Sequence, residues 1–527
     1  MTSINRAVRK AGDVPRIWNL ITNHQNMLYM LAAGLVSGPD EFGGKHYADV
    51  LDLDPGWIPL CRDTTPLPTA ALERAVSEQK FLVPCVASFD LRGFVGPVRI
   101  WPRRGKERRT TVLPLRKGKN DFIALMRAPL PVNLLRRITF RSQADQQAFE
   151  TAAADVANVD LGGVVLEVDE ARFASDNTVE LPRPPHKPEL PGFSEGEPSI
   201  DAQAIGGALA MLYHTANRSD FGAALYWFAV GLAGDEEPAG VANDPFFAGL
   251  PAWLACGTLP TSTDIPAQIY WRVVGALSDP RRSAGGKPPI DSVLDQLERE
   301  AQSISGEKPR ARITRLASAM RRCLGLGGGT ITELFKRHPG PLSRSLLLFC
   351  LREHCTDLLE FSHPVLSDAE LAATAILFGV RDGWIRIPRE LRSSELSAFV
   401  SSWMVAATHA SRNGDVRFDT PDPPTPLRDL FVTADGQWTE QQENAALDLA
   451  RREHWGDCIQ TRVTLPPGDY PQAIQRDGLQ LVIPGDATIR IEVDRPKFME
   501  RIEGSSRLEP PIANRLRAEL APPPVSP

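Results

Sequence analysis

Fourteen lysine and arginine side chains lie between Arg92 and Arg141, and only two acids, Glu107 and Asp121, accompany them. The rest of the chain has 45 basic and 63 acidic residues, a net charge of −18, whereas the net charge of the whole chain is −6. Concentrating cations costs free energy through self-repulsion, and a polyanion such as a nucleic acid relieves that cost. The chemistry that this segment indicates is therefore phosphate binding.

The densest part of this segment predicts a β-hairpin with a cationic turn. Residues 97–101 and 110–115 are predicted strands, and RRGKERR lies between them. A cationic β-ribbon can enter a groove or clamp a backbone, and Trp101 and Phe122 beside it are expected to stack on unpaired bases. Two alternatives remain open, a solvated loop without a ligand and a surface for an acidic protein. The predicted nucleic-acid-binding residues are Arg103, Arg104, Lys106, Arg108, Arg109, Arg116, Lys117 and Lys119.

A second basic segment, from Lys308 to Arg344, has nine cations and a single acid, Glu333. Helical spacing brings three of its arginines close to one face, away from Leu316, Ala319 and Met320. This predicted secondary basic face consists of Arg312, Arg315 and Arg322.

The glycine-rich run LGLGGGT at 324–330 follows on the same segment. Thr330 and Glu333 have the spacing of a capping box, which predicts a helix start and an anion-binding position in principle. The run lacks GK[ST] and follows no clear strand, so we interpret it as a turn between two helices rather than a P-loop.

Other residues with catalytic or metal-binding potential do not form a recognisable site. Arg-Glu-His occurs at 352–354 and at 452–454, each time with an aspartate three residues later. Histidine and aspartate one helical turn apart can bind a metal or share a proton, but exposed ion pairs on amphipathic helices are the ordinary explanation. The seven cysteines form no CxxC pair, and HExxH and GxSxG are absent. We therefore predict no catalytic residue, no metal and no cofactor.

Two proline-rich stretches divide the chain, because dense proline cannot continue a helix or a central strand. Before the first stretch, strands are mixed with helices; between the two stretches, apolar residues recur at helical spacing. After the second, a helix precedes three strands, the last two joined as a hairpin through Pro484-Gly485-Asp486. The expected elements are strands at 81–90, 97–101, 110–115, 460–465, 479–483 and 487–493, a helical turn and strand at 130–140, and helices at 27–36, 144–156, 201–216, 221–233, 291–303, 310–324, 344–360, 368–378, 393–410 and 438–454.

These patterns predict an α+β multi-domain protein. The expected divisions are an α+β domain at 1–180, a proline-rich linker at 181–200, a helical domain at 201–418, a small α+β domain at 427–503 and a disordered tail at 504–527. No apolar run is long enough to span a membrane, and the N-terminus lacks the apolar core of a signal peptide. With scattered cysteines, these features predict a cytoplasmic protein.

The first 160 residues resemble the DNA ADP-ribosyltransferases of the DarT type. That family opens with a segment of the form LYHxTxxxNLxxILxxGLL, continues through two strands, and ends with a strand and a VPWELIxxI turn. The similar residues here, in the same order, are 17–22 with 26–36, 56–62 with 66–67, 82–88, and 122–126 with 130–138. The resemblance implies an ADP-ribosyltransferase-like N-terminal domain.

The resemblance also implies that three functional positions have changed. The family's histidine for the NAD ribose falls on Leu20, or on Asn19 with a one-residue gap, and no arginine occurs between Arg16 and Arg62. The family's glutamate falls on Ile123, and the nearest acid is Asp121. Because ADP-ribosyl transfer needs a carboxylate beside the reacting ribose and cations on the leaving pyrophosphate, these changes argue against catalysis.

The sequence therefore predicts a non-catalytic nucleic-acid-binding subunit of a bacterial multi-protein assembly, with anti-phage defence as the setting that the resemblance suggests. DNA is favoured over RNA, other protein subunits are expected as partners, and no membrane is expected. The alternatives are an atypical ADP-ribosyltransferase acting on DNA and a protein–protein scaffold.

Overall fold

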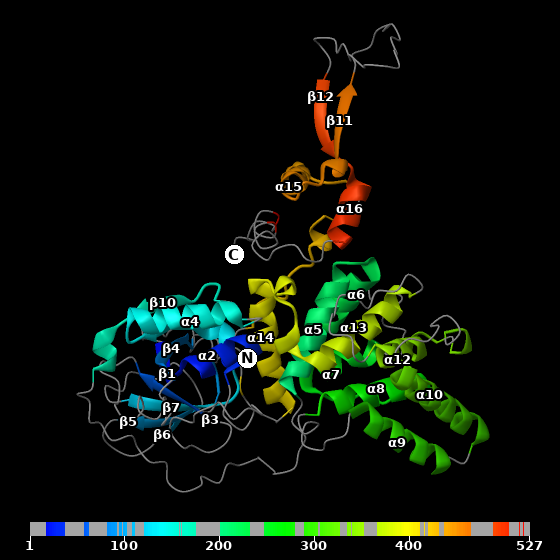
Figure 1. The fold of residues 1–527 in the computed structure, drawn as a ribbon, viewed down its shortest axis with the longest axis horizontal. Coiled ribbons are helices and arrows are strands. Elements are labelled where there is room, and N and C mark those ends of the chain that lie inside the picture. Colours follow the sequence, from blue (N-terminus) through cyan, green and yellow to red (C-terminus); the bar gives the residue numbers. More distant parts are fainter. Residues whose placement is uncertain are drawn as a thin grey trace, which may run out of the picture.

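The fold is mixed helix and sheet (Figure 1). The buried hydrophobic side chains of the described residues form three clusters. The structure is a computed structural model, and the residues that it describes are 17–36, 57–62, 82–91, 94–96, 98–102, 108–110, 121–156, 159, 161–174, 201–231, 247–279, 289–303, 306–326, 335–338, 340–352, 366–411, 416, 420–431, 437–464, 488–504, 516 and 520. Within these residues no helix is both long and apolar enough to cross a membrane.

Eight strands of the N-terminal region form one sheet, in the order β10-β9-β4-β1-β3-β7-β5-β6. The pairings are antiparallel except for that of β10 with β9. The strands are β1 (Ile17–Asn23), β3 (Trp57–Arg62), β4 (Pro84–Asp90), β5 (Val98–Pro102), β6 (Arg108–Thr110), β7 (Asp121–Arg127), β9 (Leu135–Phe140) and β10 (Val165–Val168).

The two faces of this sheet differ in chemistry. One face carries Trp18, Leu20 and their apolar neighbours, and it packs against α2 (His24–Ala33) and α4 (Gln143–Asp155). The register places Asn19, Ser88 and Arg137 together on the other face. We call this other face the polar face of the sheet.

Helix α2 begins and ends where its capping residues dictate. The side chain of Asn23 accepts a hydrogen bond from the Asn26 N–H, 2.9 Å away, which satisfies one of the free donors of the first turn. Gly34 follows the helix at φ 71°, a left-handed conformation that glycine adopts without steric cost. The predicted stop near Gly34 is therefore confirmed.

His24, the first residue of α2, connects this helix to Val83, the residue just before β4. Its Nδ1 accepts a hydrogen bond from the Val83 N–H at 3.0 Å, and burial lowers the pKa of the imidazole below its usual 6.5. An unfolded chain then binds more protons than the folded one as the pH falls through 6.5, so acid destabilises the fold through this group. In His24→Asn, whose amide oxygen accepts the same bond without titrating, we expect a smaller loss of unfolding free energy between pH 7.5 and 5.5. Urea denaturation at both pH values measures it, and an unchanged loss would contradict the assignment.

The helical region follows the sheet and contains the largest hydrophobic cluster. Its helices are α5 (Ala202–Ala216), α6 (Asp220–Ala229), α7 (Leu250–Cys256), α8 (Ile265–Leu277), α9 (Pro289–Ser303), α10 (Glu307–Leu326), α12 (Pro341–Leu351), α13 (Asp368–Asp382) and α14 (Ser394–Ser411). Each helix predicted between 201 and 410 is present, although 353–360 of one prediction lies outside the described residues. Helices α7 and α8 were not predicted.

Helix α14 lies between the sheet and the other helices (Figure 1), and polar contacts join the two regions there. Ser401 Oγ donates to the Gly34 carbonyl at 2.6 Å and accepts from the Val132 N–H at 2.9 Å. Asn133 Nδ2 donates to Ser402 Oγ at 2.8 Å, and Gln203 Nε2 donates to the Ala33 carbonyl at 2.8 Å. These bonds satisfy the free carbonyl groups at the end of α2, and they fix the sheet against the helices.

The second proline-rich stretch lies against the helical region. Tyr226 Oη donates to the Pro424 carbonyl at 3.3 Å, and the Leu427 N–H donates to Asn217 Oδ1 at 2.7 Å. Trp227 Nε1 donates to Asp429 Oδ2 at 2.7 Å. The end of the proline-rich stretch 419–426 and the residues just after it are thus hydrogen-bonded to the helical region. The predicted domain boundaries stay predictions.

The C-terminal elements are α15 (Glu440–Arg452), β11 (Ile459–Thr464), β12 (Thr488–Val493) and α16 (Arg495–Gly504), around a small cluster that includes Phe431 and Phe498. The predicted helix and its flanking strands are present. Strand β12 pairs with β11, Ile491 lying opposite Thr461. The predicted pairing of 487–493 with 479–483 stays a prediction, because residues 479–483 lie outside the description. The ribbon projects away from the rest of the molecule (Figure 1).

Candidate nucleic-acid interface

The β5–β6 hairpin is the element that carries the predicted cationic cluster. Strand β5 pairs with β6 on one side and with β7 on the other, so the hairpin extends the sheet at one end of the strand order. The register places Arg109 opposite Arg99 and Arg108 opposite Ile100. The hairpin is anchored to the sheet through β5, which pairs with β7 as well as with β6.

The start of the second strand differs from the prediction. Arg108 and Arg109 were expected in the turn, but they are the first residues of β6, because β5 offers them ladder partners as far as Ile100. Side chains of this strand are outside the description, as are residues Arg103, Arg104, Lys106, Arg116, Lys117 and Lys119. Their roles stay predictions.

Arg99 is a cation of this region that the sequence reasoning did not select. It is 5% exposed, and its guanidinium carbon lies 5.8 Å from the centre of the Trp57 ring. The alternation of Val98, Arg99 and Ile100 in a strand was the available signal, since it turns Arg99 to the face opposite its apolar neighbours. The register shows that this is the polar face, next to Leu125.

The positions that the resemblance singles out lie on both faces of the sheet. Leu20 is buried in the apolar cluster, whereas Asn19 is fully buried on the polar face. Ser88 Oγ donates to Asn19 Oδ1 at 2.7 Å, and Asn19 Nδ2 has no hydrogen-bond partner in the structure. Ile123 lies opposite Cys61, and burial raises the pKa of the Cys61 thiol to about 12. A neutral thiol and an aliphatic position cannot supply the negative charge that a transferase needs.

A buried acid lies on the polar face at a position that the sequence reasoning also missed. Asp90 pairs with Ile17, two residues from the pair of Ser88 with Asn19, so it shares their face. It is 4% exposed. The predicted strand FLVPCVASFD ends at Asp90, but the sequence did not predict that this side chain is buried.

The secondary basic face lies on α10. Arg312, Arg315 and Arg322 are exposed, and Leu316, Ala319 and Met320 are buried in the helical core, as the spacing predicted. The capping box of Thr330 and Glu333, and most of the glycine-rich run, lie outside the described residues.

Neither Arg-Glu-His segment forms a metal site within the described residues, where no group of histidine, cysteine and acidic side chains has suitable geometry. Asp457 instead accepts a 2.9 Å hydrogen bond from Arg501 Nη2, which lowers the pKa of its carboxyl group. In the first segment, residues 353–357 lie outside the description.

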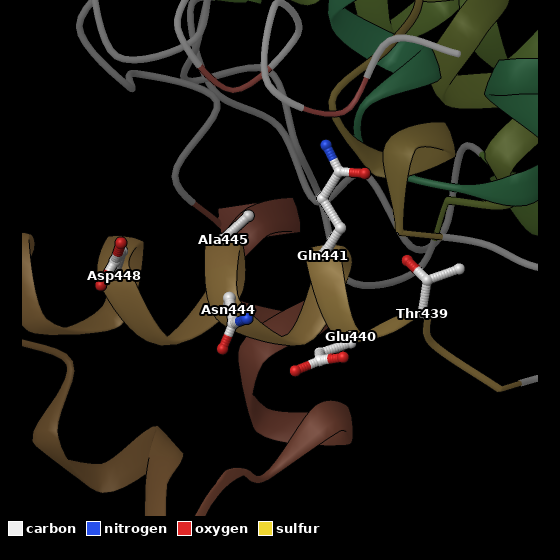
Figure 2. Close-up of a pocket in the computed structure, with 6 residues that line it drawn as sticks. All are labelled: Thr439, Glu440, Gln441, Asn444, Ala445 and Asp448. Atoms are coloured by element: carbon white, nitrogen blue, oxygen red, sulfur yellow. The ribbon is translucent and has the colours of Figure 1, made fainter. Parts of the chain in front are cut away.

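An open pocket lies along the start of α15, with a volume of about 660 Å³ (Figure 2). Its chemistry is acidic and amide-like, and no cation is among the described residues that line it. Such a lining repels phosphate, so this pocket does not extend the candidate interface. It is lined by Thr439, Glu440, Gln441, Asn444, Ala445 and Asp448.

Two solved structures are similar to part of this chain. They are DarT from Thermus sp. 2.9 in complex with carba-NAD+, at 12% identity, and the same protein in complex with NAD+, at 14% identity. Each match has a TM-score of 0.23 and covers 30% of this chain and 97% of the other. No protein-family model and no curated protein matches the chain. At this TM-score the likeness assigns neither an activity nor a ligand.

Proposed function

We propose that this protein binds nucleic acid, DNA in preference to RNA, through the β5–β6 hairpin. The observation that carries the proposal is the position of the cationic segment in the fold. The backbone of 98–102 and 108–110 forms two paired strands at the end of the sheet, and residues 98–110 include six of the fourteen cations between Arg92 and Arg141 in an otherwise acidic chain. Phosphates that bind there release counterions and relieve the repulsion among the arginines.

The protein acts in this proposal as a non-catalytic subunit of a bacterial multi-protein assembly, in the cytoplasm. Anti-phage defence is the setting suggested by the resemblance to DarT-type enzymes. Other subunits of the assembly supply the reaction, and the helical and C-terminal regions are the surfaces on which they dock.

Reversing four hairpin charges tests the proposal. We expect the combined variant Arg103→Glu, Arg104→Glu, Arg108→Glu and Arg109→Glu to bind single-stranded DNA roughly 100-fold more weakly at low salt, because each lost cation removes a phosphate contact. Fluorescence anisotropy with a labelled oligonucleotide measures the affinity. The slope of log affinity against log salt concentration is expected to become shallower as well.

A matched control separates this effect from a general change in net charge. The control variant reverses four exposed arginines on distant elements, Arg386, Arg389, Arg451 and Arg452. It is expected to retain most of the affinity. Equal binding by the hairpin variant and the wild-type protein, with circular dichroism showing both folded, overturns the proposal.

One observation favours a second candidate, an atypical ADP-ribosyltransferase acting on DNA. Asp90 places a buried carboxylate on the same face as Asn19, although the family's glutamate position is Ile123. Incubation with labelled NAD and single-stranded DNA distinguishes the candidates. We expect no transfer of label; transfer by the wild-type protein that is lost in Asp90→Asn would favour the enzyme.

A further inference from the structure

The cations of α10 divide into two groups. Arg321 is neutralised, because its Nη2 lies 2.9 Å from Asp295 Oδ1 and its Nε lies 3.1 Å from Glu298 Oε1, both on α9. Arg312, Arg315 and Arg322 are exposed, and the structure gives them no ion pair among the residues that it describes. One side of α10 is therefore electrically compensated and another is not.

A fourth cation joins the uncompensated side from a neighbouring segment. Phe335 is buried in the helical core and fixes the residues after it, so that Arg337 is exposed while His338 is only 8% exposed. Burial lowers the pKa of His338, and the positive charges of Arg315, Arg322 and Arg337 lower it further. The charges of those three arginines thus act on the same imidazole. We call Arg312, Arg315, Arg322 and Arg337 the α10 arginine face.

The helix that carries this face is rigidly held. Ile313, Leu316, Met320 and Cys323 are buried among the other helices, at the spacing that turns one stripe of α10 inward. Such packing fixes the backbone positions of the exposed arginines. The planar guanidinium fork of each arginine can bind two phosphate oxygens at once.

The α10 arginine face and the β5–β6 hairpin also have a fixed relation to each other. Helix α10 and strands β5 and β6 lie on opposite sides of α14 (Figure 1), which the bonds of Ser401 and Ser402 tie to the sheet region. When two binding surfaces are rigidly connected, the second contact of a long ligand becomes intramolecular, and its effective concentration is high.

We propose that the α10 arginine face is a second phosphate-backbone contact, and that a nucleic acid long enough to reach both surfaces binds to it and to the β5–β6 hairpin at once. This inference rests on the proposed function of the hairpin. The ligand it specifies is an extended nucleic acid, because a short one fits only one of the two surfaces.

Probe length tests the inference. The affinities of the full-length protein for a 12-nucleotide and a 60-nucleotide single-stranded DNA are compared with those of Arg312→Glu/Arg315→Glu/Arg322→Glu. We expect the variant to bind the 12-mer like the wild-type protein. Its gain in affinity from the 12-mer to the 60-mer is expected to be about tenfold smaller than that of the wild-type protein. Additional overlapping sites on the longer DNA raise both affinities equally and cancel in this comparison.

The outcomes separate the two proposals. Equal gains with length in the variant and the wild-type protein overturn the bivalent contact and leave hairpin binding intact. An equal loss of affinity for both probes overturns it too, because α10 would then be the primary contact. A different result contradicts the proposed function: unchanged binding of the 12-mer after the hairpin charges are reversed. Reversal of Arg386, Arg451 and Arg452 is the matched control for net charge.

Discussion

Gly207→Ala is expected to destabilise the fold by about 3 kcal/mol or more, because there is no space for a methyl group where α5 crosses α13. A Cβ atom on Gly207 would overlap the carbonyl oxygen of Gly379. The contact is reciprocal, since a Cβ on Gly379 would overlap the carbonyl oxygen of Gly207. Backbone on both sides cannot rotate away as a side chain can, so the helices must separate.

Separation of these helices would also disturb the packing of the hydrophobic core around them. Ile205, Met211 and Ile376 are buried beside the crossing, in the cluster that also contains Trp384. Urea denaturation followed by circular dichroism measures the expected loss. Gly456→Ala is the control, because a Cβ on Gly456 meets no atom within 4 Å, and its stability is expected to be close to that of the wild-type protein. Equal stability of Gly207→Ala and this control would contradict the close crossing.

Arg392→Met is expected to cost about 3 kcal/mol, because it removes a buried cation from acceptors that have little access to water. Arg392 is 3% exposed and lies with its guanidinium carbon 4.2 Å from the centre of the Trp384 ring. Its Nε donates to the Ile387 carbonyl at 3.0 Å, and its Nη1 donates to the Ala32 carbonyl at 3.1 Å. Its Nη2 donates to the Trp384 carbonyl.

The bond to Ala32 gives this arginine a role beyond local stability. Ala32 belongs to α2, so Arg392 connects the helix on the apolar face of the sheet with the segment that leads into α14. We therefore expect Arg392→Met to speed hydrogen exchange at the end of α2 as well as to lower the unfolding free energy. Arg389→Met makes the same change at an exposed position three residues earlier and is expected to alter stability by less than about 0.5 kcal/mol. Equal effects of the two substitutions would refute the assigned role.

The helices were predicted from the sequence because local rules govern them. The apolar spacing in 393–410 corresponds to α14, and the predicted stop at Gly34 coincides with the end of α2. Strand β1 was not predicted from its composition. Both faces of β1 are buried, and Asn19 and Thr22 interrupt its apolar run, so neither strict alternation nor a continuous apolar stretch marks it.

Pairing between strands was the other point that local rules could not determine. Strand β12 pairs with β11 across more than twenty intervening residues. Local turn signals do not identify a partner so distant in sequence, and the predicted partner of 487–493, at 479–483, lies outside the described residues. The burial of Arg99 beside Trp57 and that of Asp90 beside Asn19 depend in the same way on the whole sheet.

The sequence by itself determined where the cations are concentrated: in 92–141 and in 308–344, within an acidic chain. Only the tertiary structure decided which of them remain available to an anion. Arg321 is neutralised by Asp295 and Glu298, and Arg344 is neutralised by Glu370, 3.1 Å away. Arg315 and Arg322, on the same helix as Arg321, are exposed instead, and their charges help to lower the pKa of His338. The reason is physical: the charge of a residue follows from its type, but the charges around it come from segments that packing brings together.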